Sequence, residues 1–128
     1  MTLLIWTLFI AVLLPFIAKI PVVVTTQRLG KYDNNHPRSQ QEKLSGLGAR
    51  ALAAHQNAFE SLIIFCPAIL IAVATNHTGE LIQQAAITYL IARVIYNLLY
   101  LLNFSTLRSF VWAISLFCPV YIIWLCIP

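Results

Sequence analysis

Long apolar runs separated by short polar segments dominate the chain. Four of these runs reach the length of about 20 residues that a helix needs to cross the hydrocarbon core of a bilayer. They cover about residues 2–25, 48–75, 80–102 and 107–127. The pattern therefore predicts an all-α membrane protein, in which a single domain spanning residues 1–128 forms a bundle of four transmembrane helices.

The first run contains residues that modify a membrane helix without ending it. Pro15 and Pro21 predict kinks, which neighbouring helices can accommodate. Lys19 is the only charge in the run, and its side chain is expected to extend toward the membrane surface. The apolar stretch is longer than the core of a signal peptide and has no basic residue before it. We expect a mature membrane helix.

The segments between the runs differ in length and charge. Residues 27–47 form the one long loop, and residues 76–79 and 103–106 form short turns. Five of the eight Lys and Arg residues lie between Arg28 and Arg50, whereas the turn at 76–79 has none. The positive-inside rule places the long loop in the cytoplasm and both termini on the other side of the membrane.

Composition and charge exclude several classes of protein. Hydrophobic residues make up 60% of the chain and charged residues 9%, against about 25% charged residues in a typical soluble domain. The net charge of +4 does not indicate nucleic-acid binding, because the basic segment is short and interrupted by acidic residues. The three cysteines have no metal-ligand spacing, so we expect inert thiols and no metal site.

Glu60 and Arg93 carry charge inside apolar helices, where an ionised side chain costs at least about 2.5–3.5 kcal/mol. Glu60 lies ten residues after Arg50, and Arg93 lies nine residues before Leu102. At 1.5 Å per residue, both lie about 15 Å below the cytoplasmic boundary. Because their helices are antiparallel neighbours, the sequence predicts an ion pair between them.

Other polar residues share the helix faces of these two charges. At 100° per residue, Gln56 and Asn57 share a face with Glu60, and His55 points away from it. Tyr96, Asn97 and Tyr100 lie on the face of Arg93, and Arg108 and Ser109 open the fourth helix on the same side of the membrane. We expect these groups to converge on one cavity open to the cytoplasm.

A purely structural role would need fewer polar groups. One buried ion pair can fix the register of two helices, and polar residues do hold membrane helices together. That role does not require two tyrosines and two amides at the same depth. Their number favours a binding site.

The arrangement of these residues resembles the MAPEG family, the membrane-associated proteins in eicosanoid and glutathione metabolism. The resemblance rests on Asn57-x-x-Glu60 in the second helix, Arg93-x-x-Tyr96-x-x-x-Tyr100 in the third, and Arg108-Ser109 at the start of the fourth. It covers nearly the whole chain. The segment from Tyr32 to Arg38 resembles the bacterial branch, which implies a multi-pass protein of the bacterial inner membrane.

The resemblance implies a function and an assembly. Members include microsomal glutathione transferases, and they are homotrimers with sites between subunits. Glutathione binds as co-substrate near the cytoplasmic side, and a lipophilic small-molecule substrate approaches from the membrane lipids. Arg108 then stabilises the glutathione thiolate, with Ser109 as a second candidate for this catalytic role. The residues implied to hold glutathione are Arg28, Arg50, Gln56, Asn57, Glu60, Arg93, Tyr96 and Tyr100.

The sequence also departs from the family pattern, and this leaves two interpretations. Ala53 stands where active members usually carry Arg, and Gln56 stands where the prostaglandin synthase type has another Arg. Arg50 lies one turn earlier as a partial substitute. The first interpretation is a glutathione-dependent transferase or peroxidase acting on hydrophobic electrophiles or lipid hydroperoxides. The alternative is a non-enzymatic lipid-binding or scaffold protein with the same fold.

Overall fold

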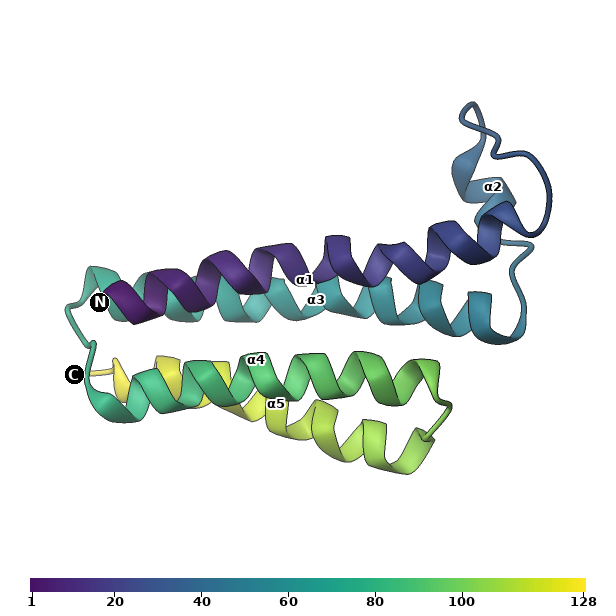
Figure 1. Ribbon diagram of the computed structural model, residues 1–128. Coiled ribbons are helices and arrows are strands. Elements are labelled where there is room, and N and C mark those ends of the chain that lie inside the picture. The colour runs from purple at the N-terminus through teal and green to yellow at the C-terminus, as the bar shows by residue number, and fades with distance from the viewer.

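The computed structural model describes all residues 1–128 and consists of five helices (Figure 1). The four long ones are α1 (Thr2–Gln27), α3 (Gly46–Ala74), α4 (Glu80–Leu101) and α5 (Ser105–Leu125). Each is long and apolar enough to cross a membrane. The predicted fold class, an all-α membrane protein with four transmembrane helices, is confirmed.

The one short helix, α2 (Pro37–Gln41), lies within the segment that we expected to be a loop. Pro37 opens this helix, and proline is well suited to the first position of a helix, where no hydrogen bond from its nitrogen is needed. The segment before α2 is held by Asp33, whose Oδ1 accepts hydrogen bonds from the backbone nitrogens of Asn35 (2.9 Å) and His36 (3.2 Å). Desolvation alone would raise the pKa of Asp33, but these hydrogen bonds bring it below its ordinary value.

The long helices run alternately up and down and pack in two antiparallel pairs (Figure 1). α1 packs against α3, and α4 packs against α5. Contacts of α3 with α4 and α5, and of α1 with α4, join the two pairs. Both termini lie at one end of the bundle, and α2 lies at the other. We call the latter the basic end; α1 and α4 end there, and α3 and α5 begin there.

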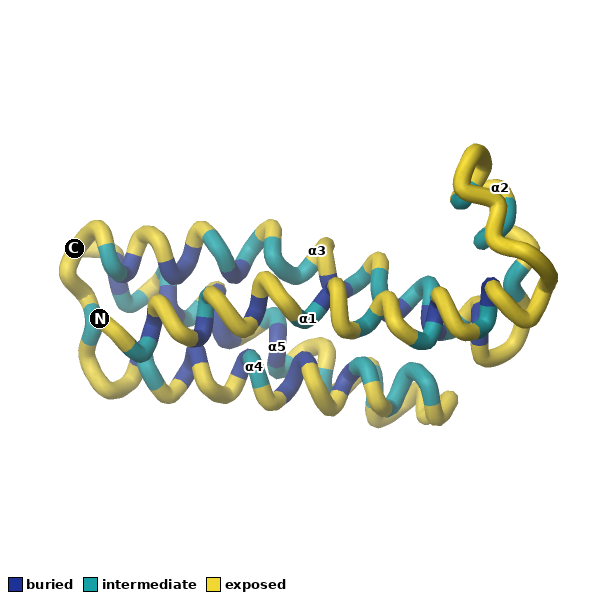
Figure 2. The backbone as a smooth tube through the Cα atoms, turned by 45° about the horizontal axis from the view of Figure 1, so that its top comes forward, coloured by how far each residue is buried: buried dark blue, intermediate teal, exposed yellow.

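Small residues let α3 approach its neighbours closely. Ala51, Ala54, Ala58, Ala68 and Ala72 are all buried on its inward faces. Such residues are typical of helix interfaces in membranes, because they bring backbones together. The buried stretches face inward along all four long helices, whereas the outward faces are exposed (Figure 2).

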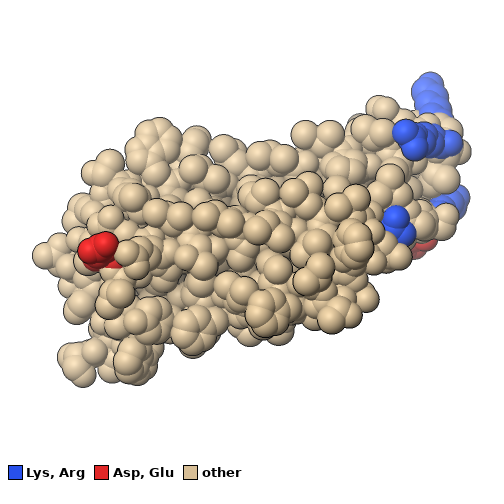
Figure 3. Space-filling view, turned by 60° about the horizontal axis from the view of Figure 1, so that its bottom comes forward, with Lys and Arg blue, Asp and Glu red and all other residues tan.

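The exposed faces are apolar as well. Ile63 is 74% exposed and Phe110 is 67% exposed. On the face in Figure 3, charged side chains lie toward the two ends, and the long middle carries none. An apolar belt between charged ends is the surface expected of a protein surrounded by lipid.

Both short turns use an asparagine in a left-handed backbone conformation. Asn76 follows α3 with φ of 60°, and Asn103 follows α4 with φ of 65°. The next residue donates its N–H back into the helix, from His77 to the Ala72 carbonyl and from Phe104 to the Leu99 carbonyl. This is the Schellman pattern, which satisfies carbonyl groups at a helix end.

Candidate functional site

A hydrogen-bonded chain of three side chains connects α3 and α4 at the centre of the candidate site. Arg93 Nη2 donates to Asn57 Oδ1 at 2.9 Å, and Asn57 Nδ2 donates to Glu60 Oε2 at 3.0 Å. The predicted direct ion pair between Glu60 and Arg93 is wrong, because the only oppositely charged pair within 4.0 Å in the molecule is His36 with Asp33. Asn57 separates the two charges and bonds to both.

The physical reason for this arrangement lies in the geometry of α3. Asn57 and Glu60 are three residues apart on one helix, so their side chains are neighbours. Arg93 is 1% exposed, whereas Glu60 remains exposed at the edge of the bundle. The side-chain oxygen of Asn57 accepts from the buried guanidinium of Arg93, and its side-chain nitrogen donates to one carboxylate oxygen of Glu60.

The guanidinium of Arg93 is only partly satisfied by the protein. Its Nε and Nη1 are buried and have no hydrogen-bond partner, and the same holds for Oδ1 of Asn97 one turn later on α4. The Tyr96 ring lies beneath the guanidinium, with Cζ 4.3 Å from the ring centroid. Buried donors without partners are costly, and in native proteins they commonly mark sites that bind water or a ligand.

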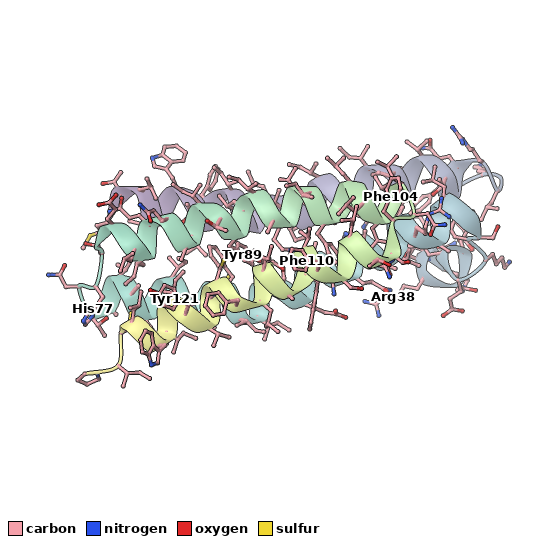
Figure 4. All side chains as sticks on the ribbon, turned by 90° about the horizontal axis from the view of Figure 1, so that it is seen from below. Arg38, His77, Tyr89, Phe104, Phe110 and Tyr121 are labelled. Carbon is pink, nitrogen blue, oxygen red and sulfur yellow. The ribbon has the colours of Figure 1, made fainter.

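Arg93 borders a cavity of about 160 Å³ between α3, α4 and α5, which we call the inner cavity. Its polar lining comes from Asn57, Glu60, Ser61, Arg93 and Ser115, and Trp112 forms part of its wall. Ser61 also meets Tyr89, with 2.8 Å between the two hydroxyl oxygens. Tyr89 lies between the helices (Figure 4) and stacks on Phe65 with ring centroids 3.8 Å apart.

A second group of predicted residues comes together closer to the basic end. The guanidinium of Arg108 lies on the Tyr100 ring, with Cζ 4.0 Å from the centroid. Tyr96 meets Tyr100 edge to face at 5.6 Å between centroids. Tyr96, Arg108, Ser109 and Trp112 line an open cavity of about 420 Å³, which we call the outer cavity.

We expected one cavity, and the structure has two that adjoin. Trp112 lines both, so its indole forms part of the wall of each. Of the predicted polar residues, Asn57, Glu60 and Arg93 line the inner cavity, whereas Tyr96, Arg108 and Ser109 line the outer one. The Ser109 hydroxyl is exposed and donates to the Ser105 carbonyl at 3.1 Å.

Three of the predicted binding residues lie elsewhere in this single chain. Gln56 lines a separate cavity between α1, α2 and α3. Arg50 donates from Nε to the Leu101 carbonyl at 3.3 Å, so this cation caps the end of α4. Arg28 is exposed at the C-terminal cap of α1 and borders neither the inner nor the outer cavity.

His55 lies away from Asn57, as its helical position predicts. Its Nδ1 is 2.8 Å from the Pro15 carbonyl oxygen, and this contact joins α3 to α1. The carbonyl accepts the hydrogen bond, so Nδ1 carries the proton and Nε2 remains available.

Sequence reasoning missed the role of Ser61, Trp112 and Ser115 in lining the inner cavity. Helical spacing contains a signal for each of them. Ser61 lies four residues after Asn57, and Trp112 lies four residues after Arg108, so each shares the face of a predicted residue. Ser115 follows three residues after Trp112.

These features define a class: a small polytopic membrane protein with polar cavities between its helices. The chain belongs to the MAPEG family, whose sequence profile matches residues 3–128. No curated protein and no solved structure gives a significant match. Membership supports a glutathione-related transferase or peroxidase function in a membrane, in general terms.

Proposed function

We propose that this protein is a glutathione-dependent transferase or peroxidase that acts on hydrophobic electrophiles or lipid hydroperoxides, with Arg108 beside the reacting thiolate. The observation that carries the proposal is the position of Arg108, whose guanidinium rests on Tyr100 and borders the outer cavity. Stacking on the ring holds this cation in place at the edge of the membrane.

The chemistry requires a fixed cation more than it requires a base. A free thiol has a pKa of about 8.5, and its thiolate is the nucleophile. A guanidinium next to the sulfur favours the anion and lowers the pKa of the thiol. The thiolate then attacks an electrophilic carbon, a carbon–sulfur bond forms, and the leaving group departs with its electron pair.

With a hydroperoxide, the same thiolate attacks the terminal oxygen. The oxygen–oxygen bond breaks, and the lipid leaves as an alcohol after taking up a proton. The resulting sulfenate reacts with a second glutathione to give the disulfide and water. The hydroperoxide gains two electrons, and the two thiols lose two electrons when they form the disulfide.

The unpartnered donors of Arg93 support a role in holding the anionic tripeptide. Its Nε and Nη1 have no partner within the protein, and Arg93 lines the inner cavity, where an anionic group of the tripeptide would accept a hydrogen bond from the guanidinium. Asn57 and Glu60 form part of the polar wall, and Glu60 offers a carboxylate to the tripeptide's amino group. Tyr96 lines the outer cavity and touches Arg93, which links the two regions.

The proposal includes a homotrimer with sites between subunits. In one chain Arg28 borders neither cavity, and the outer cavity is open at the side. A neighbouring subunit would close the cavity and bring its own Arg28 to a glutathione carboxylate. The exposed apolar faces of the helices offer the surface for such contacts and for a lipophilic substrate in the bilayer.

A lipid-binding or scaffold role remains the second candidate because of two specific observations. Ala53 and Gln56 replace expected cations, and Arg50, the partial substitute, is bonded to the Leu101 carbonyl. This interpretation expects lipid to remain bound through purification without thiol-dependent turnover.

Glutathione titration of the purified protein in detergent tests the proposal. We expect millimolar or tighter binding and conjugation of a chlorinated nitroarene. Arg108→Ala should lower turnover by about 10²–10³-fold with the fold intact, because the charge that develops on sulfur loses its counterpart. Arg108→Lys should restore part of the activity.

Lys31→Ala is the matched control, since it removes an exposed cation from the same end of the bundle. It should leave turnover unchanged. If the wild-type protein binds no glutathione at millimolar concentration, the enzymatic proposal is wrong.

A further inference from the structure

A basic cavity lies on the other side of α3 from the inner and outer cavities, between α1, α2 and α3. Its volume is about 470 Å³. Three side chains that carry or can accept positive charge line it, one from each helix: Lys19, Arg38 and His55. Glu42 is the only acidic residue in the lining. The cavity therefore favours an anion.

The donors in this cavity are free to bind. Neither Lys19 nor Arg38 forms an ion pair, and neither side chain donates a hydrogen bond within the protein. Tyr32, Gln41 and Gln56 add neutral polar groups to the lining. His55 uses Nδ1 for the Pro15 carbonyl, so its Nε2 remains for a ligand. Convergent, unpaired donors from separate elements are the arrangement that recognises phosphate.

An apolar groove continues from the basic cavity along α1. It has a volume of about 270 Å³, and Phe16, Ile20, Val23 and Val24 line it. Lys19 lines both the groove and the basic cavity, so the two adjoin at this residue. Phe59 of the basic cavity also packs edge to face on Phe16 of the groove, with centroids 5.7 Å apart.

The position relative to the membrane agrees with an amphiphilic ligand. Lys19 lies eight residues before the end of α1, about 12 Å along the helix axis. A lysine at this depth extends its ammonium group toward the membrane surface while its stem covers apolar side chains. Arg38 belongs to α2, which lies at the basic end of the bundle (Figure 1). Val23 and Val24 lie on the basic-end side of Lys19, whereas the part of the groove from Lys19 to Phe16 leads away from that end, the direction an acyl chain takes from a headgroup held at Lys19.

We propose that the basic cavity binds the phosphate headgroup of an anionic phospholipid and that the groove along α1 takes one of its acyl chains. The phosphate lies among Lys19, Arg38 and His55, and headgroup hydroxyls bond to Glu42 and the glutamines. This site is separate from Arg108 and Arg93, and it does not depend on glutathione chemistry.

The test uses the full-length protein in a neutral detergent, titrated with phosphatidylglycerol, phosphatidylcholine or glycerol 3-phosphate, with bound ligand counted by native mass spectrometry. Phosphatidylglycerol should bind more tightly than either other probe. Lys19→Gln and Arg38→Gln should each weaken its binding about fivefold, the usual contribution of one cation near an anionic lipid. Val23→Trp, which fills the groove, should weaken lipid binding but leave glycerol 3-phosphate unaffected.

Two controls separate this site from general charge and from the proposed enzyme site. Lys43→Gln removes an exposed cation of the same segment outside the cavity and should change binding less than twofold. Arg108→Ala should retain the lipid whether or not the protein proves to be an enzyme. Equal losses in Lys43→Gln and Arg38→Gln, equal binding of phosphatidylcholine, or displacement of the lipid by glutathione would each overturn the proposal.

Discussion

At the scale of single residues, Asn57 determines how a buried positive charge is accommodated. It accepts from Arg93 and donates to Glu60, so one amide connects a buried guanidinium with an exposed carboxylate. The carboxylate acts on the guanidinium from beyond Asn57, and at that distance the attraction is weaker than in direct contact. Asn57 is therefore the direct partner of Arg93, and Glu60 is an indirect one.

This arrangement predicts unequal effects of two substitutions. Asn57→Ala removes the only hydrogen-bond partner that Arg93 has within the protein and should lower stability by about 1–3 kcal/mol. Glu60→Gln should cost less than about 1 kcal/mol, because an amide oxygen can still accept from Asn57. Thermal unfolding in detergent measures both, with Gln56→Ala as a neighbouring control outside the network. A loss in Glu60→Gln as large as that in Asn57→Ala would show that the carboxylate charge itself holds Arg93.

At the scale of elements, the ends of helices set the positions of the site residues. The turn after α4 places Arg108 on Tyr100, and this turn depends on the left-handed backbone of Asn103. At the start of α3, Gly48 leaves room for α1: a Cβ there would lie 2.8 Å from Leu44 Cδ2 and 3.1 Å from Thr25 Oγ1. The backbone conformation restricts the residue type at Asn103, and the lack of space restricts it at Gly48.

Substitutions at Asn103 test the role of this turn. Asn103→Gly should be neutral or slightly stabilising, because glycine adopts positive φ without steric cost. Asn103→Val should lower stability by about 1–2 kcal/mol, since a β-branched residue is strained in that conformation. Thermal unfolding gives the stability, and glutathione affinity reports whether Arg108 has moved. Equal stability of the two variants would mean that the turn relaxes into another conformation.

At the scale of the whole molecule, charge is separated along the bundle axis. The basic segment lies at one end, and the turn at His77 lies at the other, as Figure 4 shows for Arg38 and His77. The four spanning helices place both termini on the side of His77. The positive-inside rule then predicts an orientation with Arg38 in the cytoplasm.

Cysteine labelling in intact cells tests this orientation. Arg38→Cys should react with a membrane-impermeant maleimide only after the cells are opened, whereas His77→Cys should react in intact cells. The wild-type protein serves as control, because Cys118 and Cys126 are buried and Cys66 is partly buried within α3. Labelling of Arg38→Cys from outside would reverse the orientation.

The sequence by itself determined the number and type of the long helices, because a run of about 20 apolar residues has few alternatives to a membrane helix. It also identified Tyr96, Tyr100 and Arg108 as residues of one site, because helical spacing and the short turn after the third helix bring them to the same side. Spacing within one helix is a local property that needs no knowledge of neighbouring helices.

Only the tertiary structure decided which groups bond across helices. Depth along the membrane placed Glu60 and Arg93 at the same level, but not the rotation of α3 against α4 that inserts Asn57 between them. The same packing places Arg50 within hydrogen-bond distance of the Leu101 carbonyl at the end of α4. It also distributes the polar residues of α3 between two cavities on opposite sides of the helix. Hydrogen bonds depend on shifts of about an ångström, and such shifts are set by the side chains packed between helices rather than by the pattern along any one of them.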